Sequence, residues 1–132
     1  MAVEFFVDEN DLGLGRKLSQ QQPGVLYPGH PSLPEVERGC IDEDWLQVVG
    51  QRNLVVITRD RRIRRRPVEK RMWIQHQVRG FVLTGTASQT TDQSMDVLNK
   101  HWERIASTAQ SRTQGPWMYA VTHAGPREIR LG

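Results

Sequence analysis

The chain has one cysteine and no long hydrophobic run, and these absences exclude several classes of protein. Cys40 is the only cysteine among 132 residues, so neither an intramolecular disulfide nor a zinc site built from several thiolates can form. No stretch approaches the roughly 20 apolar residues of a membrane-spanning helix. The first residues lack the basic flank and apolar run of a signal peptide, so we expect a cytoplasmic protein without membrane contact.

Three familiar metal-binding or nucleotide-binding motifs are also missing. The four histidines are far apart in the sequence and share no metal-ligand spacing, which argues against zinc chemistry. Gly13 and Gly15 begin a dinucleotide-binding pattern, but Leu18 stands where its third glycine should be. No Walker lysine motif is present either.

The composition is that of an ordinary globular domain. Hydrophobic residues make up 37% and charged residues 25%, with a mean hydropathy of −0.58. A chain of 132 residues can bury one core but not two. We therefore expect a single domain over residues 1–132, with a core at about 3–110 and a C-terminal hairpin extension at about 115–132.

Strand and helix patterns alternate along most of the chain. Expected strands lie at 3–7, 54–57 and 81–83, and a brief one at 25–27 within a proline-rich and glycine-rich excursion. Expected helices lie at 12–20, from Asp42 as N-cap to Gly50 or Asn53, from Pro67 to about 78, and from about 91 after a capping box of Thr90 and Gln93. Residues 117–121 and 128–131 predict a closing hairpin.

This alternation predicts an α/β fold with three layers, α/β/α, around a mainly parallel sheet. In open sheets of this type the functional site lies beyond the carboxyl ends of the strands. Asp8 directly follows the first strand and Asp60 follows the central strand. Asp42 begins the helix that leads into that central strand, so all three acids could converge on one edge of the sheet.

Such a convergence needs a cation. Two carboxylates ~5 Å apart repel by roughly 3 kcal/mol at an effective dielectric constant of about 20. Carboxylate oxygens select hard cations, so Mg²⁺ or Mn²⁺ is the expected occupant. A water activated by that cation could attack a phosphodiester while the cation neutralises the phosphate.

A run of basic residues lies next to Asp60. It contains Arg59, Arg61, Arg62, Arg64, Arg65 and Arg66. Arginine suits bidentate contact with phosphate, and a dense basic patch releases counterions when it binds nucleic acid. An acid cluster beside a basic patch is the combination that a nuclease requires.

Three short motifs resemble those of compact PIN-like proteins, relatives of the VapC toxins. They are Phe-Val-Asp-Glu-Asn at 6–10, Ile-Asp-Glu-Asp-Trp-Leu at 41–46 and Val-Val-Ile-Thr-Arg-Asp at 55–60, and the resemblance covers about residues 3–85. It implies an Mg²⁺- or Mn²⁺-dependent ribonuclease, with Asp8, Asp42 and Asp60 as metal-binding and catalytic acids. Thr58 and Asn10 are implied as supporting residues.

The resemblance further implies the toxin half of a toxin–antitoxin pair, with RNA as substrate and a small antitoxin as partner. Full-length PIN domains carry one more acid before the position of Asp42. Here that interval is a proline-rich loop with Asp11, Glu35 and Glu37 as substitutes. Whether the site holds one metal ion or two therefore stays open. The hairpin and the long helix could also supply a homodimer surface.

Other interpretations stay open at this point. Asp42 could be a plain N-cap, Asp60 a turn acid paired with a neighbouring arginine, and the arginine run a solvated surface. Two other functions compete: a receiver-like domain that accepts a phosphoryl group, and a catalytically inactive module that binds RNA or protein. The receiver-like interpretation lacks the expected lysine after a late strand, since the only late lysine is Lys100, inside the long helix.

Overall fold

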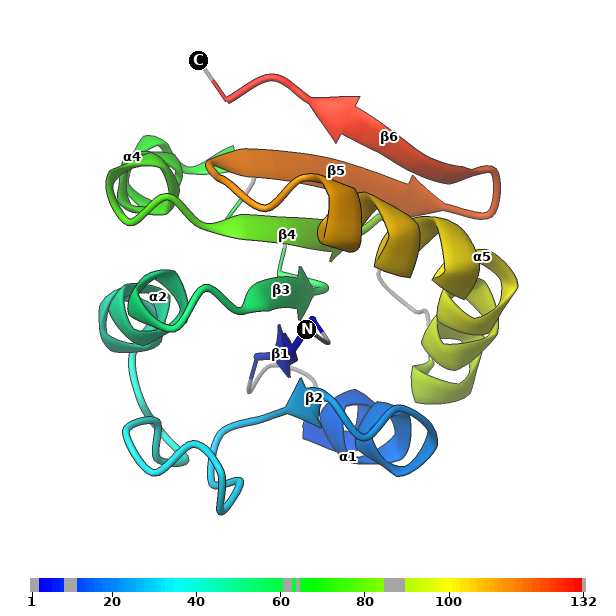
Figure 1. Cartoon of the computed structure of the whole chain (residues 1–132), viewed down its shortest axis with the longest axis horizontal. Coiled ribbons are helices and arrows are strands. Elements are labelled where there is room, and N and C mark those ends of the chain that lie inside the picture. Colours follow the sequence, from blue (N-terminus) through cyan, green and yellow to red (C-terminus); the bar gives the residue numbers. More distant parts are fainter. Residues whose placement is uncertain (1–2, 9–11, 61–62, 64, 85–89, 132) are drawn as a thin grey trace.

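Helices and strands alternate as the sequence predicts. The computed structural model describes residues 3–8, 12–60, 63, 65–84 and 90–131. In chain order these residues form β1 (Phe5–Val7), α1 (Leu12–Gln21), β2 (Val25–Leu26), α2 (Asp42–Gln51), β3 (Val55–Thr58), α4 (Pro67–Gln75), β4 (Arg79–Leu83), α5 (Thr91–Ser111), β5 (Trp117–Thr122) and β6 (Gly125–Ile129) (Figure 1).

The strands form one mixed sheet in the order β2-β1-β3-β4-β5-β6. Neighbouring strands from β2 to β5 are parallel, and β6 pairs antiparallel with β5 as the closing hairpin. β1 and β3 lie side by side, with Val7 opposite Ile57. The carboxyl ends of these two strands therefore meet at one edge of the sheet.

Helices cover both faces of the sheet, which confirms the expected three layers (Figure 1). Side chains alternate between the faces along each strand. Phe5 and Val7 of β1 pack into a core with α1 and α5, whereas Phe6 packs into a second core with α2 and α4. Continuing this alternation places the side chain of Asp8 on the α2 side.

Both α2 and α4 end in the same way, and this sets where the next strand begins. Asn53 and Gln77 adopt left-handed conformations with φ of 53° and 54°. The next residue in each case donates its N–H back into the helix, from Leu54 to Val49 and from Val78 to Trp73, as in a Schellman motif. α4 consequently ends at Gln75 rather than at about residue 78 as predicted.

The excursion between β2 and α2 is irregular, as predicted, and is anchored by two apolar side chains. Leu33 and Val36 are buried in the α2-side core. Backbone hydrogen bonds from Leu33 to His30 and from Gly29 to Val36 hold successive turns. The excursion is thereby packed against the same core that contains the first turns of α2.

α5 begins with the predicted capping box, in which the Thr90 side chain and Gln93 satisfy each other's backbone N–H groups. Apolar residues recur at helical spacing along α5: Met95, Leu98, Ile105 and Ala109 are buried, and Trp102 packs against Phe5 with ring centroids 4.9 Å apart. None of the helices formed by the described residues combines the length and the apolar character needed to cross a lipid bilayer.

A buried arginine secures the other end of α5. Arg79, at the start of β4, is 3% exposed. Its guanidinium donates to the carbonyls of Ala109 and Arg112 at 2.9 and 3.0 Å and to that of Asn53 at 2.8 Å. Burial lowers the pKa of this guanidinium from its ordinary value. Carbonyls that the helix leaves unsatisfied at its last turn are thus satisfied by a residue of the sheet.

Candidate functional site

The ends of β1 and β3 bring two predicted acids together. Asp8 follows β1, and Thr58 ends β3 two residues before Asp60. The register of the two strands places Thr58 at the level of Asp8. All three side chains are buried, with exposed fractions of 1% for Asp8, 0% for Thr58 and 7% for Asp60.

The hydroxyl of Thr58 connects the carboxylate of Asp8 to the backbone of Asp60. It donates a hydrogen bond to Oδ2 of Asp8 at 2.6 Å and accepts one from the backbone N–H of Asp60 at 2.9 Å. The second bond spans two residues, which is the geometry of an ST turn. Thr58 therefore orients the Asp8 carboxylate and sets the turn that carries Asp60.

Removing two carboxylates from water is costly unless nearby groups or a cation compensate their charge. The donors at this edge are carboxylate and hydroxyl oxygens, which suit a hard divalent cation. Mg²⁺ commonly takes one or two carboxylates and keeps several waters. Asp8 and Asp60 thus fit such a cation by their chemistry, their burial and their common link to Thr58.

Asp42 lies at the start of α2, but not as the N-cap that the sequence predicts. The N-cap is Ile41, whose side chain makes no capping hydrogen bond, and Asp42 is the first helical residue. Its Oδ1 instead accepts a hydrogen bond of 2.9 Å from Nε1 of Trp45. An acid in the first helical turn still interacts favourably with the helix dipole, so the carboxylate remains useful to the helix without capping it.

The topology places Asp42 at the same edge of the sheet as Asp8 and Asp60. α2 leads directly into β3, so its last turn lies near the start of that strand and its first turn near the carboxyl end. Among the described residues, however, no three Asp, Glu, His or Cys side chains form a group that could hold a metal ion. Within these residues the structure connects Asp8 and Asp60 and leaves Asp42 outside their group.

Two of the substitutes for a fourth acid lie elsewhere. Glu35 and Glu37 line a hollow of about 450 Å³ beside α2, together with Asp44. Glu35 also pairs with Arg52 at 3.2 Å. Asp11, the third substitute, lies outside the described residues, as does the supporting residue Asn10.

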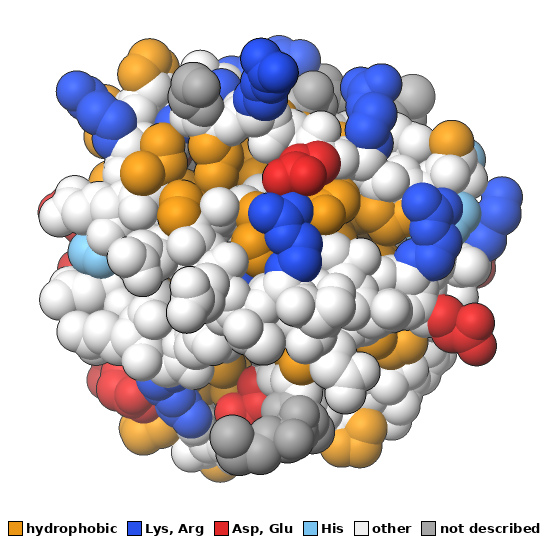
Figure 2. Space-filling view, turned by 45° about the horizontal axis from the view of Figure 1, so that its top comes forward, with side chains coloured by type: hydrophobic (Ala, Val, Ile, Leu, Met, Phe, Trp, Pro, Cys, Tyr) orange, Lys and Arg blue, Asp and Glu red, His pale blue; other side chains and the backbone are white. Residues whose placement is uncertain are grey.

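The predicted RNA-binding arginines are described only in part. Arg59 donates to the hydroxyl of Ser94, in the first turn of α5, at 3.1 Å. Arg65 is exposed, and Arg66 lies 3.8 Å from Glu69 with 60% of its side chain exposed. Lysine and arginine side chains are spread along the upper part of the face shown in Figure 2. Arg61, Arg62 and Arg64 lie outside the described residues.

Sequence reasoning missed the hydrogen bond between Trp45 and Asp42. The tryptophan has the properties of a core residue, and it is indeed 2% exposed. The available signal was its position three residues after an acid in the first turn of a helix, because side chains at this spacing share a face.

The family comparison covers the segment of the chain that contains this site. The family model described as a PIN-like domain matches residues 3–85, a segment that includes β1, α2 and β3 and therefore Asp8, Asp42, Thr58 and Asp60. No curated protein and no solved structure matches the chain. Because the matched segment is more than half of the chain and contains the strand ends that carry both buried acids, the chain belongs to the family of PIN-like domains.

Proposed function

We propose that this protein is an Mg²⁺- or Mn²⁺-dependent endoribonuclease. The observation that carries the proposal is two buried acids at the carboxyl edge of the sheet: the Asp8 carboxylate accepts a hydrogen bond from the Thr58 hydroxyl, and the backbone N–H of Asp60 donates to that same hydroxyl. Membership of the PIN-like family supports a nuclease in general terms. The neighbouring arginines favour a substrate with a phosphate backbone.

Each described residue has a definite task in this proposal. Asp8 and Asp60 hold the divalent cation, and Thr58 keeps the Asp8 carboxylate in one orientation. Asp42 contributes a third negative charge from the first turn of α2. When bound, the cation supplies a water of lowered pKa and positive charge for the phosphate. Arg59, Arg65 and Arg66 would bind substrate phosphates next to the cation.

The biological role that we propose is that of a toxin neutralised by a small antitoxin. It rests on the resemblance of the three motifs to VapC-type proteins. Expression of the chain alone should arrest growth, and expression of the Asp60→Asn variant should not. Normal growth at equal amounts of both proteins would contradict the toxin role but not the nuclease chemistry.

A PIN-like module that binds RNA without cutting it is the second candidate. It is favoured by the observation that Asp42 stays outside the Asp8 and Asp60 group among the described residues. RNA cleavage in Mn²⁺ separates the two candidates. Tight, salt-sensitive RNA binding in EDTA without cleavage after addition of Mn²⁺ would favour the inactive module.

The test is cleavage of an end-labelled RNA by the wild-type chain and by Asp8→Asn and Asp60→Asn, with an Asp96→Asn control. Asp96 is exposed in α5 and is none of the three predicted acids, so its change removes the same charge while Asp8, Asp42 and Asp60 stay intact. We expect Mn²⁺-dependent cleavage by wild type and control, and none by the two site variants at unchanged circular dichroism. Cleavage at the wild-type rate by both site variants would overturn the proposal.

A further inference from the structure

Trp45 is a buried side chain that the proposed chemistry does not yet use. It lies one helical turn after Asp42 and donates its indole N–H to Oδ1 of that residue at 2.9 Å. The tryptophan is 2% exposed, whereas Asp42 is partly exposed. Among the described residues, Oδ2 of Asp42 accepts no hydrogen bond. One oxygen of this carboxylate is therefore held by the protein core, and the other remains available.

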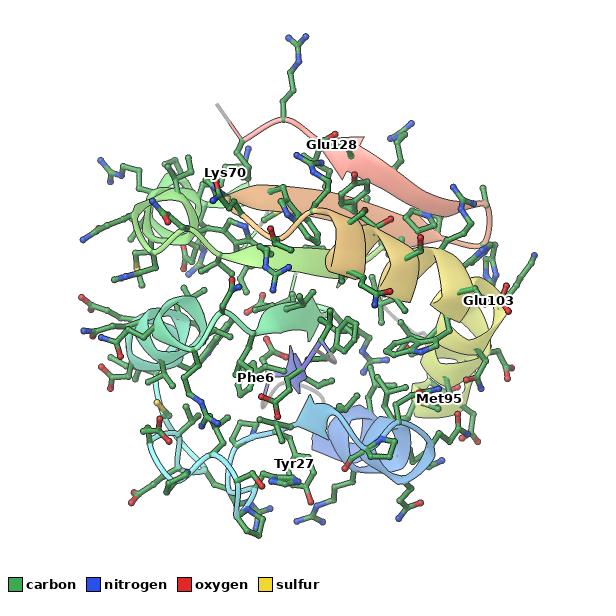
Figure 3. All side chains as sticks on the ribbon, in the orientation of Figure 1. Phe6, Tyr27, Lys70, Met95, Glu103 and Glu128 are labelled. Carbon is green, nitrogen blue, oxygen red and sulfur yellow. The ribbon has the colours of Figure 1, made fainter. Side chains whose placement is uncertain are left out.

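The indole itself is held by the strand that carries Asp8. Its ring packs against that of Phe6, with centroids 5.2 Å apart and an interplanar angle of 31°. Phe6 belongs to β1 and lies two residues before Asp8. Figure 3 shows Phe6 on the side of β1 that faces α2. The contacts thus form a short path from β1 through Phe6 and Trp45 to the Asp42 carboxylate.

We propose that Trp45 is a positioning residue that orients Asp42 toward the divalent cation held by Asp8 and Asp60. This inference rests on the proposed function. A carboxylate at the start of a helix can adopt several side-chain rotamers, and a hydrogen bond from a fixed donor selects one of them. Hydrogen bonds of this kind typically orient metal-binding carboxylates, and losing one lowers metal affinity 10–100-fold.

The position of Asp42 outside the group of two acids agrees with this role. Mg²⁺ keeps several of its waters when proteins bind it. Asp42 can therefore act on the cation through one of these waters, without entering a group of three direct ligands. An orientation fixed by Trp45 is then needed, because a water-mediated contact depends on where the free oxygen points.

The test compares two tryptophans of the same core. Trp73 is also fully buried, and its Nε1 donates to the carbonyl of Trp117 at 3.1 Å, at the start of β5 and thus at the opposite edge of the sheet. Trp45→Phe and Trp73→Phe each remove one indole hydrogen bond and the same ring volume. Mn²⁺ affinity, measured by electron paramagnetic resonance of the free ion, is compared for wild type and both variants.

We expect Trp45→Phe to weaken Mn²⁺ binding about 10-fold, the lower end of what losing an outer-sphere partner costs, because Asp42 acts through a water, and Trp73→Phe to change it less than about 2-fold. Equal effects of the two variants, or unchanged or tighter binding by Trp45→Phe, would overturn the inference while leaving the nuclease proposal intact. If the wild-type chain binds no Mn²⁺, both fail together.

A double-mutant cycle of Trp45 and Asp42 shows whether Trp45 acts through Asp42. In an Asp42→Ala background, Trp45→Phe should produce no further loss of Mn²⁺ affinity, since contributions that run through one group are not additive. A full additional loss in that background would contradict the positioning role.

A third measurement needs no tryptophan variant and remains valid if Trp45→Phe does not fold. Addition of Mg²⁺ to the ¹⁵N-labelled wild-type chain should shift the indole N–H signal of Trp45 and leave that of Trp73 in place. The Trp45 signal is identified by its change in Asp42→Ala. An indole signal of Trp45 that is insensitive to Mg²⁺, in a chain that binds Mg²⁺, would refute the proposal.

Discussion

The hydroxyl of Thr58 lies 2.6 Å from Oδ2 of Asp8, although the two residues are 50 positions apart in the chain. Thr58 ends β3 and Asp8 directly follows β1, and the parallel register of these strands brings the two residues level. The same hydroxyl accepts the N–H of Asp60. One small side chain therefore determines the arrangement of both buried acids.

Replacing Thr58 by valine should disturb this arrangement while keeping the shape of the side chain. We expect Thr58→Val to lower the free energy of unfolding by about 2 kcal/mol, because a buried carboxylate loses a donor. Mn²⁺ affinity should fall as well. Thr58→Ser, which keeps the hydroxyl, is the matched control and should retain most of the affinity. Urea titration measures the stability of both variants, and Mn²⁺ titration measures their affinity for the cation. Equal losses of stability and of affinity in Thr58→Val and Thr58→Ser would show that the hydroxyl is irrelevant.

Binding of the cation should stabilise the folded chain. A ligand present at 100 times its Kd contributes about 2.7 kcal/mol when it binds only the folded state. We expect Mn²⁺ to raise the midpoint of thermal unfolding in wild type and in Asp96→Asn. The same Mn²⁺ concentration should leave Asp8→Asn and Asp60→Asn almost unchanged, because these variants lack a cation ligand. An equal rise in all four proteins would point to Mn²⁺ bound outside the predicted site.

The exposed arginines before α4 should contribute to RNA binding by neutralising phosphates. In the Asp60→Asn background, which prevents cleavage, the double variant Arg65→Gln, Arg66→Gln should bind RNA more weakly. Its plot of log K against log salt concentration should become shallower by about 0.7 for each phosphate that the variant no longer neutralises. The control is Arg127→Gln, Arg130→Gln, two exposed residues of the C-terminal segment. Identical salt slopes in both double variants would place the RNA on another surface.

Two glycines should respond oppositely to alanine. A Cβ at Gly80 would lie 2.7 Å from the carbonyl oxygen of Val56 and 2.8 Å from the Trp73 ring, so Gly80→Ala should cost about 1–3 kcal/mol through overpacking. A Cβ at Gly13 would lie 3.7 Å from Thr91. Gly13 is an exposed helical residue, and alanine there should stabilise the chain by about 0.5–1 kcal/mol. The midpoints of thermal unfolding of the two variants test this prediction. Shifts of both midpoints in the same direction would contradict the packing described for Gly80.

Arg79 and Arg112 should differ in their importance for stability. Arg79→Met removes donors from three carbonyls around the end of α5, and we expect a loss of about 3 kcal/mol. Arg112 pairs with Glu128 at 2.9 Å while 39% of its side chain is exposed; this hydrogen bond raises the pKa of its guanidinium. Arg112→Met should cost no more than about 1 kcal/mol. Similar unfolding midpoints for the two variants would refute the proposed role of Arg79.

The start of α2 shows where prediction from local sequence failed. An aspartate before an apolar helix predicts an N-cap, yet the helix begins one residue earlier than that prediction requires, with Ile41 as N-cap. The side chain of Asp42 turns to the indole of Trp45 instead. That indole is fixed by Phe6 of β1, a residue far from α2 in the sequence. A contact from another element thus decides the orientation of Asp42.

The sequence by itself determined the alternation of strands and helices, the parallel character of the sheet and the acids that follow β1 and β3. These are local properties, because hydrophobic periodicity and a polar residue after an apolar run act within a few positions. Only the tertiary structure decided that Thr58 joins Asp8 to the Asp60 turn and that Asp42 lies outside that pair. It also decided that Arg79 donates hydrogen bonds to the carbonyls at the end of α5. Each of these depends on strand order and register, which bring distant segments to within hydrogen-bonding distance and which no local pattern encodes.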